Sequence, residues 1–189
     1  MTQLTVLTPP AEDPVTLDAV KAFLRIGDAS EDGLAADLIG AARARLERVA
    51  GLALVDQSIR FIWRDWSATS HGGARLPVSP VRQLIAVRFV DEEAGTTEVT
   101  DQFQIVCDRL VLRPWNALPS VPPGGHVEID LRVGFGAAAD VPDDLSEALL
   151  RLIGAMYSTR TPGAFDLSAA GGLPQNVQAI LDARKEVRL

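Results

Sequence analysis

The sequence predicts an α+β fold in which helices flank a run of antiparallel strands. Apolar residues recur every three or four positions near both ends of the chain, but they alternate with polar residues through its middle. The alternating segments also follow one another across short turns, as strands do when they pair antiparallel with their neighbours. The order is a pair of helices, a β region, a long helix and a short final helix.

The chain should begin with an extended arm and a first helix. Residues 1–14 contain three prolines and show no periodicity, so we expect an arm without regular structure. Thr16 is a good N-cap for a helix whose apolar positions follow from Leu17 onward. Gly27 should end that helix.

A second helix should begin at Ser30 or Asp32 and end at Gly51, a residue that favours the helix C-terminus. Acidic residues crowd its start and arginines crowd its end, which suits the helix dipole. Because arginine is favoured at protein interfaces, three of these arginines are candidate subunit contacts. They are Arg43, Arg45 and Arg48.

The β region shows two clear alternating strands, at residues 59–63 and 127–133. Residues 84–90 are nearly continuous in apolar side chains and predict another strand. Shorter strands are expected at residues 97–100, 103–106 and 110–112. Residues 67–75 read as a loop.

The C-terminal part begins with Pro142, a favoured first helix residue, and its acidic neighbours start a long helix. We therefore expect a core domain over residues 15–160. Residues 161–173 are rich in small residues and read as a flexible linker. Residues 174–189 should form a detached helix, whose single apolar stripe has no evident partner in the chain and is suited to docking.

Composition excludes several classes of protein. In 189 residues, 47% are hydrophobic and 23% charged, which is ordinary for a globular chain. The sequence contains no apolar run long enough to span a membrane, and we expect residues 1–14 not to be a secretory signal because they lack a basic stretch and a long apolar run. The single Cys107 excludes an internal disulfide. A net charge of −7 argues against a protein that grips nucleic acid through phosphates.

Motifs for catalysis are weak, so we expect no enzymatic activity, no metal and no cofactor. Gly134-Phe135-Gly136 lacks the third glycine of a dinucleotide loop and reads as a plain turn. Cys107 and His126 have no spacing that places them together, and Ser70-His71 lacks a nucleophile elbow. Trp63 belongs to the apolar side of its strand. Trp66 and Trp115 lie in or near loops, and they are candidate protein-interface residues.

Four passages stand in a characteristic order along most of the chain. They are Val15 to Ile26 with Asp37 to Leu54; Leu76 to Val81 before residues 84–90; Val133 to Gly136 with Val141-Pro142 and Leu145 to Arg160; and the ending around Pro174, Val177 and Ile180 to Arg188. This ordered set resembles the head–tail connector, or adaptor, proteins of long-tailed phages and of phage-derived gene transfer agents.

The resemblance implies a structural role in the neck of a virion or gene transfer agent particle, assembled in the host bacterial cytoplasm. Such proteins form a ring, typically of twelve copies, beneath the portal. The ring joins the portal to the next neck component, or stopper, and DNA passes through its lumen without sequence-specific binding. With a net charge of −7 on each subunit, we expect acidic side chains to line that lumen.

On this interpretation the C-terminal segment docks on the portal through Val177, Ile180, Leu181, Arg184, Val187, Arg188 and Leu189. Two other classes stay open at this point. One is a soluble interaction module with no role in a particle, and the other is a hydrolase that uses His71 or Cys107.

Overall fold

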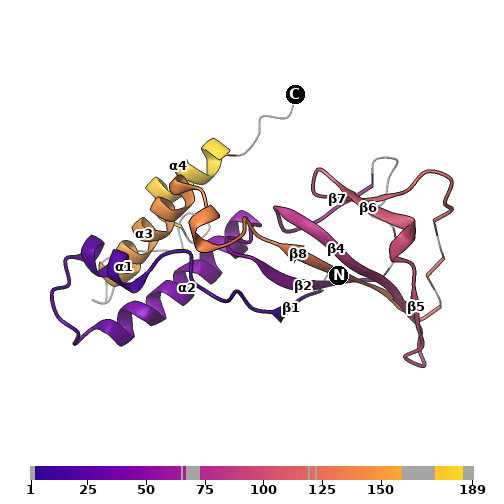
Figure 1. Cartoon of the computed structure of the whole chain (residues 1–189), viewed down its shortest axis with the longest axis horizontal. Helices are drawn as coiled ribbons and strands as arrows, with labels where there is room; N and C mark the ends of the chain where they lie inside the picture. The colour runs from indigo at the N-terminus through magenta and orange to yellow at the C-terminus, as the bar shows by residue number, and fades with distance from the viewer. Residues whose placement is uncertain are drawn as a thin grey trace. The chain divides into compact units, whose positions relative to one another are not determined.

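A computed structural model of the chain describes residues 3–64, 66, 73–118, 120–121, 123–158 and 173–184. It has the predicted α+β fold, with helices and antiparallel sheets in the predicted order (Figure 1). The chain forms two compact units. The strand unit comprises Met1–Ala11 and Asp56–Gly134, and the helical unit comprises Glu12–Val55 and Phe135–Leu189. The expected core over residues 15–160 is thus divided between two units.

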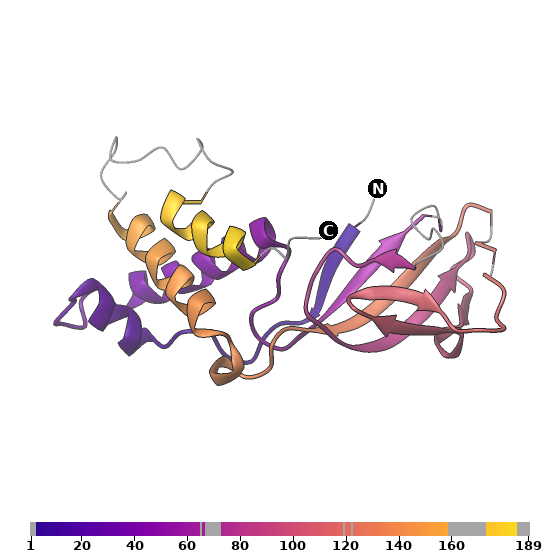
Figure 2. The same ribbon diagram turned by 90° about the horizontal axis from the view of Figure 1, so that it is seen from above.

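The strand unit contains two antiparallel sheets (Figures 1 and 2). The larger sheet has the order β1-β2-β8-β4-β5, and the smaller has the order β3-β7-β6. The strands are β1 (Gln3–Thr8), β2 (Gln57–Trp63), β3 (Ala74–Arg75), β4 (Val81–Val90), β5 (Thr96–Glu98), β6 (Phe103–Val106), β7 (Arg109–Leu112) and β8 (His126–Val133), with a 3₁₀ turn η1 (Thr100–Gln102) before β6.

The predicted strands are confirmed, and two further strands appear. β1 forms within the expected arm and pairs with β2, while β3 lies at the end of the expected loop at residues 67–75. β3 is only two residues long, and β1 pairs with a strand some fifty residues away. β3 is too short to show a pattern, and the alternation in β1 is masked by the prolines that follow it.

Side-chain alternation separates the two faces of the larger sheet. On β8, the four residues at alternate positions from Val127 to Val133 are fully buried. This apolar face packs toward the smaller sheet, where Phe103 of β6 stacks on Trp66 with ring centroids 5.2 Å apart. The opposite face carries His126, Glu128 and Asp130.

The helical unit contains α1 (Leu17–Leu24), α2 (Asp32–Ala50), α3 (Asp143–Ser158) and α4 (Gln175–Arg184), with a 3₁₀ turn η2 (Ala138–Asp140) before α3. The Thr16 hydroxyl accepts a hydrogen bond from the Ala19 amide at 3.1 Å, as predicted for an N-cap. Gly51 ends α2 in the left-handed conformation, with φ +65°. α1 ends at Leu24, earlier than expected, because Arg25 adopts the left-handed region itself.

Leucine, isoleucine and valine side chains from all four helices form the core of the helical unit. Each fully buried leucine contributes on the order of 1.5–3 kcal/mol relative to an exposed one. The fully buried members include Val20 of α1, Leu46 of α2, Leu149 and Leu152 of α3, and Val177 of α4.

Candidate functional site

The C-terminal helix α4 was expected to present its apolar stripe to another protein. In the structure this stripe packs against α3, and the two helices lie side by side in both views (Figures 1 and 2). Val177 is 0% exposed, Leu181 is 5% exposed, and Ile180 packs partly buried on the same core. The premise that the stripe lacks a partner in the chain is therefore wrong. An apolar stripe at this spacing indicates that one face of the helix is buried, but it does not show whether the same chain or another protein buries it.

The end of α4 is also tied to the helical unit. Arg184 forms an ion pair with Asp144 of α3, and its guanidinium carbon lies 5.9 Å from the ring centroid of Phe135. The remaining predicted docking residues, Val187, Arg188 and Leu189, lie outside the described residues. The same holds for residues 161–172 of the expected linker, whereas Leu173 is buried.

The three arginines near the end of α2 differ in their surroundings. Arg43 donates a hydrogen bond to Asp13 at 2.7 Å and is held within the helical unit. Arg45 is partly buried, while Arg48 is exposed. Of the three, Arg48 is the most accessible to another molecule.

The two tryptophans proposed as interface residues have opposite environments. Trp66 is only 9% exposed, because its ring stacks on Phe103 and meets Trp63 and Phe89 edge-on. The prediction that Trp66 lies at an interface is therefore wrong, because its ring is buried in the core of the strand unit. Trp115, by contrast, is fully exposed in the segment between β7 and β8.

The candidate catalytic residues are placed as follows. Cys107 is exposed and occupies the turn between β6 and β7, where it and Asp108 both adopt positive φ. His126 begins β8, and its Nε2 lies 3.7 Å from the Glu128 carboxylate. His71 lies outside the described residues. Within the described residues, no cluster of three or more histidine, cysteine or acidic side chains is arranged to hold a metal ion.

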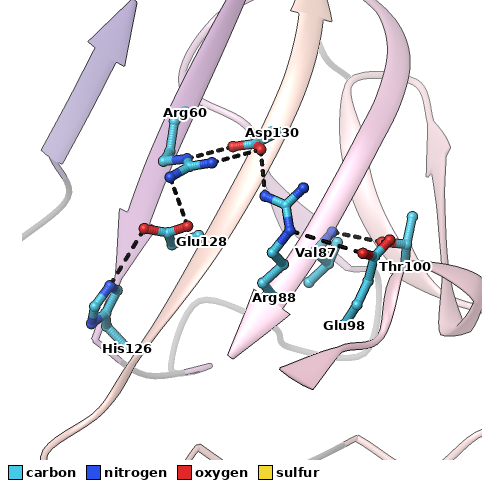
Figure 3. Close-up of polar contacts among 8 residues, drawn as sticks. All are labelled: Arg60, Val87, Arg88, Glu98, Thr100, His126, Glu128 and Asp130. Carbon is cyan, nitrogen blue, oxygen red and sulfur yellow. Dashed lines mark hydrogen bonds and ion pairs between the residues drawn. The ribbon is translucent and has the colours of Figure 1, made fainter. Parts of the chain in front are cut away.

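A charged cluster that the sequence did not reveal crosses the polar face of the larger sheet (Figure 3). Asp130 lies at its centre and is only 3% exposed. Arg60 of β2 forms a bidentate pair with the Asp130 carboxylate, with nitrogen–oxygen distances of 2.6 and 2.9 Å. Arg88 of β4 donates to the same carboxylate at 2.6 Å from the other side. The Glu128 carboxylate forms an ion pair with Arg60 at 2.8 Å, so that two carboxylates balance the charges of the two arginines.

Electrostatics favour the ionised form of Asp130. Burial is the largest influence on its pKa and would raise it, but the hydrogen bonds from Arg60 and Arg88 together outweigh burial and hold the pKa below its ordinary value. In turn, the hydrogen bond to Asp130 raises the pKa of Arg60. Two arginines place three hydrogen bonds on a carboxylate that is only 3% exposed, so Asp130 is engaged within the sheet. We assign it a structural role in joining β2, β8 and β4.

The edge strand β1 is a second feature that sequence patterns missed. All six of its residues are exposed, including Leu4, Val6 and Leu7. Leu4 and Val6 alternate along the strand, and this was the available signal, but the prolines that follow suggested an irregular arm. The strand unit therefore exposes apolar side chains on β1 as well as on the Trp115 segment.

In the described part of the chain, no helix has the length and apolar character needed to cross a membrane. No protein-family model matches the sequence, and no curated protein matches it significantly. The positive findings come from solved structures.

Three solved chains are similar to this one from end to end. The first comes from the neck of an empty gene transfer agent (GTA) particle computed with C6 symmetry, with a TM-score of 0.76 and 28% identity over 99% of this chain and 97% of that chain. The second comes from the virion of a native GTA particle, with a TM-score of 0.74, 27% identity and the same coverage. The third comes from the neck of a native GTA particle computed with C12 symmetry, with a TM-score of 0.69, 27% identity and the same coverage.

The chain therefore has the fold of a structural component of a phage-like particle. The comparisons confirm the resemblance that the ordered sequence passages indicate, which is to the phage-derived head–tail connector or neck proteins. Both compact units take part in this similarity, because the alignments cover 99% of the chain.

Proposed function

We propose that this protein is a head–tail adaptor that forms a ring beneath the portal of a phage-like particle. The observation that carries the proposal is the end-to-end similarity to chains from GTA particle necks. The ring would join the portal to the next neck component and leave a lumen for DNA. Its role would be structural rather than enzymatic, and it would assemble in the bacterial cytoplasm before the particle is complete.

A ring of twelve copies is the number we favour. The similar necks were computed with C6 and C12 symmetry, and a ring of twelve identical subunits satisfies both because six divides twelve. A closed ring of one chain needs a heterologous contact, in which each subunit uses two different surfaces.

Contact with the portal is proposed for residues 185–189, which follow α4, and for the exposed parts of α4 itself. The buried side chains of Val177 and Leu181 support this contact only indirectly, by fixing α4 on α3. Arg184, at the end of α4, is half-exposed and lies next to this segment. The proposed docking element is therefore residues 185–189 together with the exposed side chains of α4.

The lumen is proposed to be acidic. The helical unit contains fifteen acidic and ten basic residues, and the strand unit contains ten and eight, so the negative charge is concentrated in the helical unit. Repeated around a ring, this charge would repel DNA phosphates and let DNA slide with little adhesion. A ring structure with an arginine-lined pore would overturn this part of the proposal.

Imaging of purified particles without imposed symmetry tests the proposal directly. We expect a ring of twelve copies of this chain between the portal and the next neck component. Deleting residues 185–189 should leave a folded protein that no longer joins portal-bearing heads, while a Gln83→Ala variant, at an exposed position of β4, serves as a control for a surface change elsewhere. Normal incorporation of the truncated protein would contradict the portal contact. Absence of the chain from particles would contradict the adaptor function and favour a separate interaction module.

A further inference from the structure

The two edges of the larger sheet are protected very differently. β5 is three residues long and ends in Glu98, as expected for an edge that resists pairing with other chains. β1 is six residues long, and residues 1–11 contain no charged side chain. A long, uncharged and apolar edge strand is a surface on which another chain can pack.

The apolar side chains of β1 continue the buried rows of the sheet. Leu4 lies opposite Phe61, which lies opposite Ile129, so these three side chains form one row on the inner face. Phe61 and Ile129 are at most 1% exposed, whereas Leu4 is 46% exposed. Val6 likewise continues the row of Ile59 and is 47% exposed. The side chains that bury the inner face at β2 and β8 therefore leave the inner face of β1 exposed.

A second apolar surface lies in the segment between β7 and β8. Trp115 is fully exposed and adopts φ +69°, a strained conformation for a tryptophan. The segment is anchored where it leaves β7: the Arg113 amide donates to the Gln102 carbonyl at 2.8 Å, and its guanidinium donates to the Phe103 carbonyl at 3.0 Å. Leu118, three residues further on, is 42% exposed.

These two surfaces meet the needs of a heterologous contact. They belong to the same compact unit, and β1 and the β7–β8 segment lie on opposite sides of it in both views (Figures 1 and 2). Neither surface carries a charge, since residues 114–125 contain no acidic or basic side chain. Packing one against the other would bury aliphatic and aromatic side chains without leaving an unpaired charge.

We propose that the β1 surface of one copy, formed by Leu4 and Val6, receives the Trp115 segment of the next copy in the ring. The proposal rests on the ring assembly proposed above and names the surfaces that form it. Trp115 is the anchor, because its fully exposed ring would bury a large apolar area while only two side-chain torsions are fixed. We assign a second copy as the occupant because the similar chains come from necks computed with C6 and C12 symmetry, in which identical subunits repeat around a ring.

Cross-linking in purified particles tests this pairing. In a Cys107→Ser background, Val6→Cys and Ala117→Cys together should give a ladder of linked copies with a short bismaleimide reagent. Each single-cysteine variant should stay below the trimer, because one thiol per copy links at most two chains. A double variant present in particles but giving no ladder, or giving only links within one chain, would overturn the pairing while leaving the adaptor function intact. Absence of the protein from particles would overturn both.

A substitution series tests the anchor itself. Trp115→Ala should reduce incorporation into particles at least tenfold while leaving the thermal unfolding temperature unchanged. Ile85→Ala is the matched control, because Ile85 is an exposed apolar side chain of β4, 41% exposed and outside both surfaces. Incorporation of Trp115→Ala at the level of the control would overturn the role of this residue.

Discussion

Arg60 and Asp130 face each other across neighbouring strands β2 and β8, and they form a bidentate pair whose carboxylate is almost completely buried. Arg88 binds the same carboxylate from β4, so one acid ties together the three central strands of the sheet. The pair lies on the face opposite the apolar core. On that polar face the ion pairs help to fix the pairing register of the strands, as apolar packing does on the other face.

Replacing Asp130 by asparagine should destabilise the strand unit by about 3 kcal/mol, because it leaves two partly buried guanidinium groups without their shared carboxylate. Chemical denaturation at pH 7 measures the change. Glu98→Gln is the control: Glu98 is 60% exposed and 3.9 Å from Arg88, so its loss should cost less than about 0.5 kcal/mol. Equal effects of the two substitutions would contradict the central role of Asp130.

The stabilisation from Asp130 should depend on pH in the acid range. Its pKa in the folded protein lies below the ordinary value of 3.8, so the folded state binds this proton more weakly than the unfolded chain does. The contribution is therefore complete above about pH 5 and is lost as the pH falls through the folded-state pKa. We expect the difference in unfolding free energy between the wild type and Asp130→Asn to shrink steadily below about pH 4. A difference that stayed constant down to pH 2 would show that the carboxylate charge is not its source.

Sequence patterns predicted most of the fold because its elements are locally encoded. The alternation from Val127 to Val133 marks β8, and the Thr16 cap and Gly51 mark helix boundaries. β1 was missed because its strand character depends on a partner distant in sequence. The Asp130 cluster was missed for the same reason, since alternation shows which face a residue takes but not which strand lies beside it.

Two of the interface expectations, for Trp66 and for the stripe of α4, depended on burial that tertiary contacts decide. Trp66 and Trp115 both sit near loops in the sequence, yet one ring is stacked on Phe103 and the other is fully exposed. The stripe of α4 favours a docking surface on sequence grounds, but Val177 and Leu181 belong to the core of the helical unit. In both cases the residue types show that the side chains bury apolar surface, but they do not show which part of the protein, or which other molecule, covers them.

The packing of α4 on α3 predicts a contrast between two truncations. Deleting residues 185–189 should leave the unfolding free energy of the helical unit nearly unchanged, because the buried positions of α4 are retained. Deleting residues 174–189 should destabilise that unit strongly, since it removes both Val177 and Leu181 from the core. Circular dichroism during thermal unfolding distinguishes the two outcomes.

A point substitution in α4 gives the same test with less disturbance. Leu181→Ala should lower the unfolding free energy by about 2–4 kcal/mol, as expected when a buried leucine is truncated. Gln175→Ala, at an exposed position of the same helix, should change it by less than about 0.5 kcal/mol. If Leu181→Ala proved as mild as Gln175→Ala, α4 would not be packed on α3 in solution.

The two tryptophans predict opposite results for the same substitution. Trp66→Ala should cost about 3–5 kcal/mol, because it removes a ring enclosed by Trp63, Phe89 and Phe103. Trp115→Gly should leave the isolated protein as stable or raise its unfolding free energy by about 0.5–1 kcal/mol, since glycine adopts the left-handed backbone of this position without strain. Chemical denaturation of both variants measures these changes. If glycine at position 115 is at least as stable, the strained and fully exposed tryptophan brings no benefit to the monomer. A loss of stability in Trp115→Gly would therefore weaken the case that this ring serves assembly.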